Sequence, residues 1–398
     1  MSTRLNFLSR EFMENPYPYL AVLRQQGPVV QVDPGGMWAI TRYDEAQFVL
    51  KSPQRFSSEG MRRAFQPEWL GRTNPAVTSM VFMDPPQHGR LRTLVSRAFT
   101  PAAIAHLESL IRATARSLVS QLLERRKVDF VEAFSVPIPA TLMGFLLGLD
   151  ISHQASFKRW AHAVLCLGGV RAEDTEQMAR SRHTIDEMKM YLEEVLDDRR
   201  RRPREDMLSD LLRARVDGAS LTHEEVLGFL SLLLIGGLET TTHLLSHSVQ
   251  VLCLHPELLP QLREQPSLIP SFIEETLRYE PNGSALLRIC LQDTLVSDVK
   301  IPQGALVLVS LSSASRDEKY FPDGDRFILG RKGAPHLSFG HGPHFCLGAM
   351  LARMEGRIAL EELVPHVGRL ELRTERIDWS YSLNTRGPKS LPIEVFPV

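Results

Sequence analysis

The stretch FGHGPHFCLG, residues 339–348, decides the fold of this 398-residue chain. Its glycine-rich loop delivers Cys346 to the start of an amphipathic pattern that runs from Gly348 to about Val364, where Pro365 stops it. A helix N-terminus offers free amides and a positive dipole end, so it can stabilise an anion such as a thiolate. The glycines allow tight turns and close approach to a flat ligand. The pattern predicts a metal-ligating cysteine; the alternative is a buried structural cysteine.

A second feature is a long apolar helix. Thr222 and Glu225 form a capping-box pattern, apolar residues continue to Leu254, and His255 with Pro256 marks the stop. About 30 residues at 1.5 Å per residue give roughly 45 Å. A helix this long and this apolar must cross the core of the protein.

Polar residues interrupt this helix at its middle. Gly236 and Gly237 each cost about 1 kcal/mol relative to alanine, which indicates close approach of another group. Glu239 and Thr240 follow, and buried polar groups need partners or a task. Next to a thiolate-ligated iron, whose electron density favours O–O cleavage, that task is proton delivery during dioxygen reduction. The alternative is a bent helix whose Thr240 hydroxyl bonds back to the Gly236 carbonyl.

Two residue pairs are weaker signals, which become informative only together with the cysteine loop and the long helix. Glu275 and Arg278 are three residues apart and can share a helix face. His88 and Arg92 are four apart after Asp84-Pro85-Pro86, and two such donors suit an acidic ligand group such as a haem propionate. Read alone, each pair is more typical of a solvated surface.

His243 and His247 have the i,i+4 spacing of metal ligands. No third ligand accompanies them, so core or surface histidines are the favoured interpretation.

Composition bounds the remaining possibilities. The net charge of −1 attracts neither nucleic acid nor an anionic membrane, and the longest near-apolar run, 227–238, is too short for a membrane span. The four cysteines lack paired spacing, and no signal peptide begins the chain, so a cytoplasmic setting is expected. No linker divides residues 1–398, which predicts one domain.

Periodicity indicates a mainly α fold with small β-sheets. A β-hairpin is expected at 29–41, and the three β-containing parts are about 27–57, 285–315 and 368–398. The helical bulk is expected at about 86–280 and 348–364.

In this order, the four patterns resemble the cytochrome P-450 superfamily, in particular its soluble bacterial class. The match runs from about residue 84 to the C-terminus, and the hairpin also fits. The resemblance implies a triangular-prism domain with the long central helix over haem b, iron protoporphyrin IX. The departures are Glu239 where many members have aspartate, Pro343 before the cysteine, and Gly324-Asp325 before Arg326.

The resemblance also implies roles for particular residues. Cys346 would ligate iron, Phe339 would pack near it and help to tune the iron, and Gly340 and Gly348 would form part of the cofactor-binding loop. Gly236, Gly237, Glu239 and Thr240 would form the oxygen-binding groove. The haem propionates would be held by His88, Arg92, Arg288 and His344. Glu275 and Arg278 would be a buried structural pair with Arg326 as third partner.

The implied reaction is insertion of one oxygen atom of O2 into an organic substrate, with electrons from NAD(P)H through a ferredoxin or flavodoxin and its reductase. Candidate docking residues for such an acidic partner are Arg90, Arg92 and Arg353. The family pattern places substrate walls at 69–82, at 166–170 and near 284–287 and 383, and their aliphatic character suggests a terpenoid, steroid, fatty acid or polyketide. The individual candidates are Ile235, Ser284, Ala285, Leu287 and Leu383.

Three rival functions stay open. A peroxygenase would use hydrogen peroxide directly, but such members usually lack an acid–alcohol pair like Glu239-Thr240. A haem-thiolate ligand sensor or carrier would be non-catalytic. A third rival keeps the haem and changes the chemistry to desaturation, ring coupling or nitration.

Overall fold

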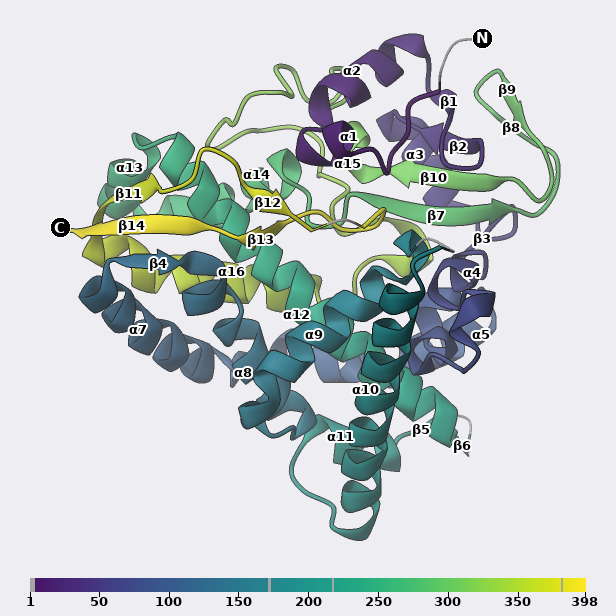
Figure 1. Cartoon of the computed structure of the whole chain (residues 1–398), viewed down its shortest axis with the longest axis horizontal. Coiled ribbons are helices and arrows are strands. Elements are labelled where there is room, and N and C mark those ends of the chain that lie inside the picture. The colour runs from purple at the N-terminus through teal and green to yellow at the C-terminus, as the bar shows by residue number, and fades with distance from the viewer. Residues whose placement is uncertain (1–3, 171–172, 217, 381) are drawn as a thin grey trace.

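The computed structural model describes residues 4–170, 173–216, 218–380 and 382–398. Helices make up most of the molecule, and the sheets lie along one side of it, apart from a two-stranded sheet at residues 215–220 (Figure 1). The outline in Figure 1 is broad along the side that carries the sheets and narrows towards α10 and α11. The expected mainly α fold with small sheets is confirmed.

The α-helices in the described residues have the following bounds: α1 Arg10–Glu14, α2 Tyr17–Gln26, α3 Tyr43–Lys51, α4 Met61–Phe65, α5 Gln87–Ser96, α6 Pro101–Ala105, α7 Glu108–Arg125, α8 Pro137–Leu147, α9 Gln154–Leu165, α10 Thr175–Arg201, α11 Met207–Arg213, α12 His223–Leu254, α13 Leu258–Glu264, α14 Ile269–Tyr279, α15 Leu311–Ala314 and α16 Ala349–Leu363.

The strands are short. The five-stranded sheet has the order β1-β2-β10-β7-β3, and the three-stranded sheet has the order β11-β14-β4. Three further two-stranded sheets join β12 to β13, β5 to β6 and β8 to β9. The bounds are β1 Val29–Val32, β2 Met37–Ile40, β3 Phe56–Ser57, β4 Lys127–Asp129, β5 Arg215–Val216, β6 Ala219–Ser220, β7 Ala285–Cys290, β8 Thr294–Val296, β9 Val299–Ile301, β10 Leu306–Ser310, β11 Val367–Leu372, β12 Asp378–Trp379, β13 Pro388–Ser390 and β14 Pro392–Pro397.

The expected hairpin and long helix are both present. Val29 to Val32 pair antiparallel with Ile40 to Met37. Thr222 caps α12, and the reciprocal bond from Glu225 completes the capping box. By length and composition α12 could cross a membrane, but 78% of its apolar window is buried, as befits a core helix.

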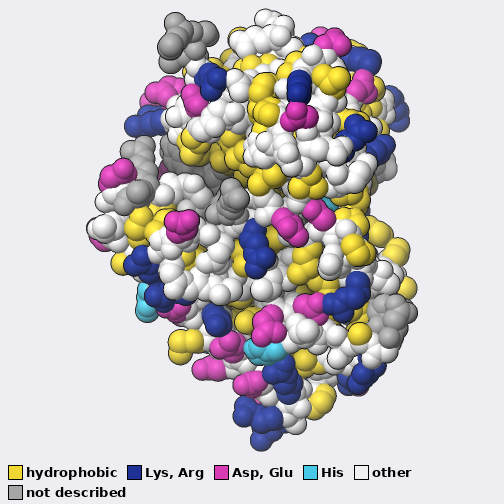
Figure 2. Space-filling model, turned by 90° about the vertical axis from the view of Figure 1, so that its right-hand side faces the viewer, with side chains coloured by type: hydrophobic (Ala, Val, Ile, Leu, Met, Phe, Trp, Pro, Cys, Tyr) yellow, Lys and Arg dark blue, Asp and Glu magenta, His cyan; other side chains and the backbone are white. Residues whose placement is uncertain are grey.

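One large hydrophobic cluster contains residues from both ends of the chain, from Phe7 to Val395, and a smaller one lies around the five-stranded sheet. Acidic and basic side chains are interspersed on the face shown in Figure 2, in keeping with the net charge of −1.

Candidate functional site

A cavity of about 1100 Å³ lies between α12 and the loop that leads into α16. Cys346 and Thr240 face the same space from these two elements. Apolar atoms dominate its walls. The lining residues from α12, the loop and α16 are Leu232, Leu233, Gly236, Gly237, Thr240, Thr241, Phe339, His344, Phe345, Cys346, Leu347, Gly348, Leu351, Ala352 and Glu355.

The loop geometry explains its glycines. Gly340 and Gly342 have φ angles of 71° and 70°, which side-chain-bearing residues rarely adopt. A Cβ on Gly342 would also lie 2.5 Å from the Leu50 carbonyl oxygen. The Cys346 amide donates to the Phe339 carbonyl at 2.9 Å, and Gly348 caps α16. The sequence therefore folds into a tight turn that presents the Cys346 sulfur to the cavity.

The electrostatics at Cys346 differ from the sequence expectation. Burial raises the pKa of the thiol, and the Gly348 amide together with the charges of Arg92 and Arg353 opposes this only in part. A coordinated metal cation would supply the remaining positive charge, because a metal-bound thiol is deprotonated.

A cluster of cationic and donor side chains lies beside the cysteine. His88 and Arg288 are buried, and the rings of His88 and His344 lie 4.1 Å apart. Arg92 donates to the Phe345 carbonyl at 2.7 Å, and Arg288 donates to the Leu287 carbonyl at 2.8 Å. Within the described part of the chain, none of the four has a carboxylate within ion-pair distance.

Burial and the mutual repulsion of these groups lower the pKa values of members of the cluster. Burial lowers the pKa of Arg288 to about 10. Burial, followed by the charges of Arg288, His88 and Arg92, lowers the pKa of His344 to about 3. Buried cations normally have anionic partners. The two propionates of a haem are such partners, so the residues present fit that group.

The distal wall is formed by the middle of α12. A Cβ on Gly236 would meet nothing within 4 Å, so this glycine leaves the helix bare towards the cavity. A Cβ on Gly237 would lie 2.7 Å from Sδ of Met143, so an added methyl group here would displace the end of that side chain. The Thr240 hydroxyl donates to the Gly236 carbonyl at 2.5 Å, which is the alternative arrangement considered from sequence.

Glu239 is not where the sequence interpretation placed it. Its side chain lines a second cavity, of about 670 Å³, rather than the cavity that Thr240 and Cys346 share. Oε1 lies 3.7 Å from Nδ1 of His162 and 3.8 Å from Nε2 of His243. Burial acts to raise the pKa of Glu239, but His162, His243 and Lys158 outweigh it and hold the pKa below its usual value. The physical reason is helical geometry, since adjacent residues project in different directions.

Glu275 and Arg278 form a buried pair joined by two hydrogen bonds of 2.8 Å. The third partner is Arg331, whose Nε lies 3.1 Å from Oε1 of Glu275. The expectation for Arg326 is wrong: its side chain is exposed, and only its backbone carbonyl accepts from Arg278, at 2.9 Å.

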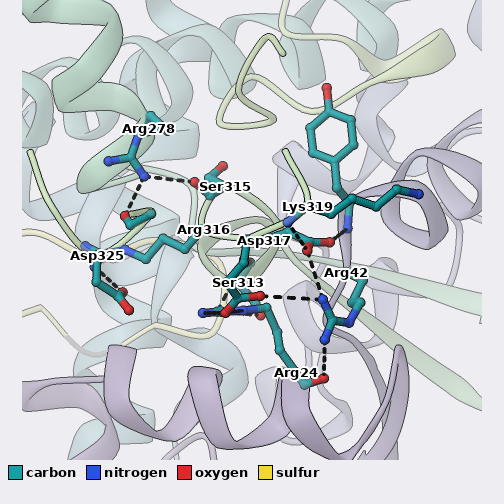
Figure 3. Close-up of polar contacts among 12 residues, drawn as sticks. Arg24, Arg42, Arg278, Ser313, Ser315, Arg316, Asp317, Lys319 and Asp325 are labelled. Atoms are coloured by element: carbon teal, nitrogen blue, oxygen red, sulfur yellow. Dashed lines mark hydrogen bonds and ion pairs between the residues drawn. The ribbon is translucent and has the colours of Figure 1, made fainter. Parts of the chain in front are cut away.

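Arg278 also ties down the chain that precedes the cysteine loop. It donates to the carbonyls of Ser315 and Gly324 at 3.0 and 2.7 Å. Figure 3 shows the Ser315 contact beside the ion pair of Arg316 with Asp325.

The substrate candidates do not line the main cavity. Ser284, Ala285 and Leu383 border a smaller cavity of about 370 Å³ near Phe7 and Phe12. Ile235 and Leu287 are buried in the hydrophobic core. From the expected wall at 69–82, Met80 and Val81 do reach the main cavity.

Sequence reasoning missed Leu232 and Leu233. They precede Gly236 by four and three residues, so helical spacing puts them on its face, whereas Ile235 projects elsewhere.

The proposed docking arginines all have internal partners. Arg90 pairs with Glu225, and Arg92 bonds the Phe345 carbonyl. Arg353 pairs with Glu274 at 2.6 Å. The charges of Arg90 and Arg353 are therefore partly neutralised by carboxylates, whereas the described residues give Arg92 a neutral carbonyl as its partner.

Fold and site together define a haem-thiolate class of protein: a long core helix faces a cysteine loop across an apolar cavity edged by unpaired cations. Residues 156–366 match the family model Cytochrome P-450. The chain belongs to the cytochrome P-450 family, whose named monooxygenases are oxidoreductases that use haem iron.

Relatives match over nearly the whole chain. Cytochrome P-450 109 of Bacillus spizizenii is 37% identical, covering 96% of this chain and 92% of its own length. Cyclomarin C epoxidase CymV of Salinispora arenicola is also 37% identical, covering 94% of each.

Solved structures agree. CYP109Q5 from Chondromyces apiculatus superposes with a TM-score of 0.90 at 38% identity and 100% coverage of both chains. CYP109E1 from Bacillus megaterium, in complex with testosterone, gives a TM-score of 0.88 at 34% identity, covering 97% of this chain and 99% of its own.

Proposed function

We propose that this chain is a haem b monooxygenase that inserts one oxygen atom of O2 into a hydrophobic small organic molecule. The observation that carries the proposal is the common cavity of Cys346, His88, Arg92 and His344, with the buried Arg288 beside them. One sulfur ligand and a set of hydrogen-bond donors that includes two guanidinium groups match the iron and the two propionates of one haem. We also infer that residues 1–398 act as a single domain.

Each residue of the proximal side has a definite task. Cys346 would ligate the iron, and the turns at Gly340 and Gly348 would keep its sulfur pointed into the cavity. Phe339 holds the Cys346 amide through its carbonyl, and its ring lies under the Arg353 guanidinium at 4.4 Å. These contacts limit motion of the sulfur.

On the distal side, the bound haem would supply reductive activation of O2 with electrons from outside the chain. Thr240 lines this space and holds its hydroxyl hydrogen on the Gly236 carbonyl. Rotation about the Thr240 side chain would redirect the hydroxyl towards the cavity. We propose that Thr240 passes protons there and that Glu239 supplies them.

The substrate wall is apolar. Met80, Val81, Leu232 and Leu233 line the cavity, so a ligand would bind chiefly by removing apolar surface from water. One relative is named for epoxidation of cyclomarin C, and one structural neighbour holds testosterone. A terpenoid, steroid, fatty acid or polyketide substrate is consistent with these walls.

Electrons would come from NAD(P)H through a ferredoxin or flavodoxin and its reductase, in the cytoplasm. The apolar groove of Ile104, Ile273, Met350 and Met354 lies on the side of α16 near Arg353. With Arg353 already paired to Glu274, docking on this face would depend on apolar contact as well as charge.

The test is spectroscopic. Purified protein that is loaded with haem b, reduced and exposed to carbon monoxide should show a thiolate-type Soret band, and Cys346→Ser should lose it. Absence of the band in the wild type, or its survival in Cys346→Ser, would contradict the proposal. A screen of steroids and fatty acids for a spin-state shift would then define the substrate class.

Glu239 points away from the cavity of Cys346, and this direction favours testing a second candidate function, a peroxide-driven peroxygenase. Turnover with hydrogen peroxide alone would be compared with turnover by NADH and redox partners. Faster peroxide turnover would support that candidate.

A further inference from the structure

We propose that His162 is a positioning residue that holds the Glu239 carboxylate towards the second cavity, through which protons from solvent reach Glu239. This inference rests on the proposed function and adds a route for its protons. It concerns side chains of α9 and α12.

The two cavities lie against different sides of α12. Thr240, Gly236 and Gly237 line the one that contains Cys346, whereas Leu238, Glu239 and Thr242 line the other. The Glu239 side chain is about one-tenth exposed, while that of His162 is 43% exposed. His162 therefore lies between the buried carboxylate and solvent.

Charge explains why His162 holds Glu239. The titratable groups that face His162 are Lys158 on α9, Cys166 directly after α9, Glu239 and His243 on α12, Lys389 on β13, and Glu132, which pairs with Lys158. The neighbouring Cys166 and Glu239 raise the pKa of His162 to about 10, so it is cationic at neutral pH. His243, by contrast, is kept neutral by burial, which lowers its pKa to about 4. Of the two imidazoles near Glu239, His162 is therefore the cationic one and His243 the neutral one.

Gly236 connects the two sides. It precedes Glu239 by three residues and Thr240 by four, so it shares a helix face with each of them. A Cβ at Gly236 would meet nothing within 4 Å, and the Thr240 hydroxyl already contacts its carbonyl. The helix surface is therefore bare at Gly236, beside the Thr240 hydroxyl.

The proton balance is simple. A proton from solvent binds Oε1 of Glu239, which neutralises the carboxylate and removes its attraction to His162. The neutral acid turns across Gly236 and gives this proton to Oγ1 of Thr240, which releases its own hydroxyl proton into the first cavity. Glu239 is again an anion and returns to His162. One proton enters, one leaves and no electron moves.

The first experiment measures the contact directly, without turnover. Histidine side chains labelled with ¹⁵N would be titrated by NMR in the diamagnetic ferrous carbon monoxide form of the holoenzyme. We expect His162 to titrate well above pH 7 in the wild type and at least about one pH unit lower in Glu239→Gln, because the anion is gone. An unchanged midpoint in Glu239→Gln overturns the proposal.

The second experiment measures proton delivery. Hydrogen peroxide released per NADH consumed would be followed with a plant ferredoxin and its reductase as electron donors. Poor proton delivery favours release of peroxide over formation of water. His162→Gln should therefore raise the peroxide yield about threefold, and replacing H2O by D2O should change this yield more in the variant than in the wild type. His162→Lys restores the positive charge and should return the yield close to that of the wild type.

His183→Gln is the matched control, because His183 is an exposed histidine on α10. Its peroxide yield should equal that of the wild type. The positioning role is overturned if His162→Gln and His162→Lys both give the wild-type peroxide yield. It is also overturned if both variants raise the peroxide yield equally. The carbon monoxide band of each variant separates this outcome from loss of the haem site, since failure of the proposed function would remove the band itself.

Discussion

Glu275 and Arg278 face each other across one turn of α14 through two hydrogen bonds of 2.8 Å, with each side chain only 3% exposed. Arg278 also donates to the carbonyls of Ser315, Gly324 and Arg326. The pair therefore ties helix α14 to the turn-rich segment that leads to the cysteine loop. An ion pair this deeply buried is costly to break on one side only.

Arg278→Ala should therefore destabilise the protein strongly. It leaves the Glu275 carboxylate buried with Arg331 as its only guanidinium partner among the described residues and deprives three carbonyls of a donor, which predicts a loss of about 3–5 kcal/mol. Urea denaturation followed by circular dichroism measures the change. Arg331→Ala is the matched comparison and should cost less, because Arg331 makes one 3.1 Å contact with Glu275 and its three hydrogen bonds to backbone carbonyls are exposed, whereas those of Arg278 to Ser315 and Gly324 are buried. Equal losses in the two variants would contradict this ranking.

His243 should make stability depend on acid pH. Burial lowers its pKa to about 4 from an ordinary value of 6.5, so the unfolded chain takes up a proton that the folded chain refuses. Stability from this group is present above pH 6.5 and is lost as pH falls towards 4, by up to about 3 kcal/mol. Denaturation midpoints of His243→Gln should vary less over this range. The exposed His153 gives the control His153→Gln, which should keep the wild-type slope.

The features that the sequence predicts best are those that depend on residues close together in the chain. The capping box at Thr222, the stop at His255 and the glycine turns before Cys346 each follow from neighbouring residues, and the structure confirms them. Long-range partners were harder to infer. Arg331 contacts Glu275 from 56 positions away, and no local pattern marks it.

The direction of a side chain on a helix proved the weakest inference. Glu239 and Thr240 were paired because they are adjacent, yet neighbours on a helix diverge and the two line different cavities. Ile235 is a predicted substrate contact, yet it is buried in the core, whereas Leu232 and Leu233 line the cavity. Helical spacing from Gly236 selects Leu232 and Leu233 over Ile235, but it does not separate Glu239 from Thr240, which lie three and four residues beyond Gly236.

Arg288 offers a test of the propionate site. It is buried without a carboxylate partner among the described residues, so Arg288→Leu should remove one charge-assisted bond to haem. Such bonds contribute about 1.5–3 kcal/mol, which predicts haem transfer to apomyoglobin at least about tenfold faster. Haem dimethyl ester, whose propionates are uncharged, is the control ligand. With the ester, wild type and variant should release the group at similar rates, and a persistent difference would point to packing instead of charge.

The two glycines of α12 should respond differently to the same added methyl group. Gly236→Ala places its Cβ in open space and should gain about 1 kcal/mol from helix propensity. Gly237→Ala gains the same propensity but brings its Cβ to 2.7 Å from Sδ of Met143, so the repacking should cancel or reverse the gain. Urea denaturation of the ferric holoprotein measures both. Because the Gly236→Ala methyl group enters the cavity of Cys346, it should also weaken binding of 4-phenylimidazole relative to the wild type. A more stable Gly237→Ala than Gly236→Ala would show that Met143 yields freely and that packing does not require this glycine.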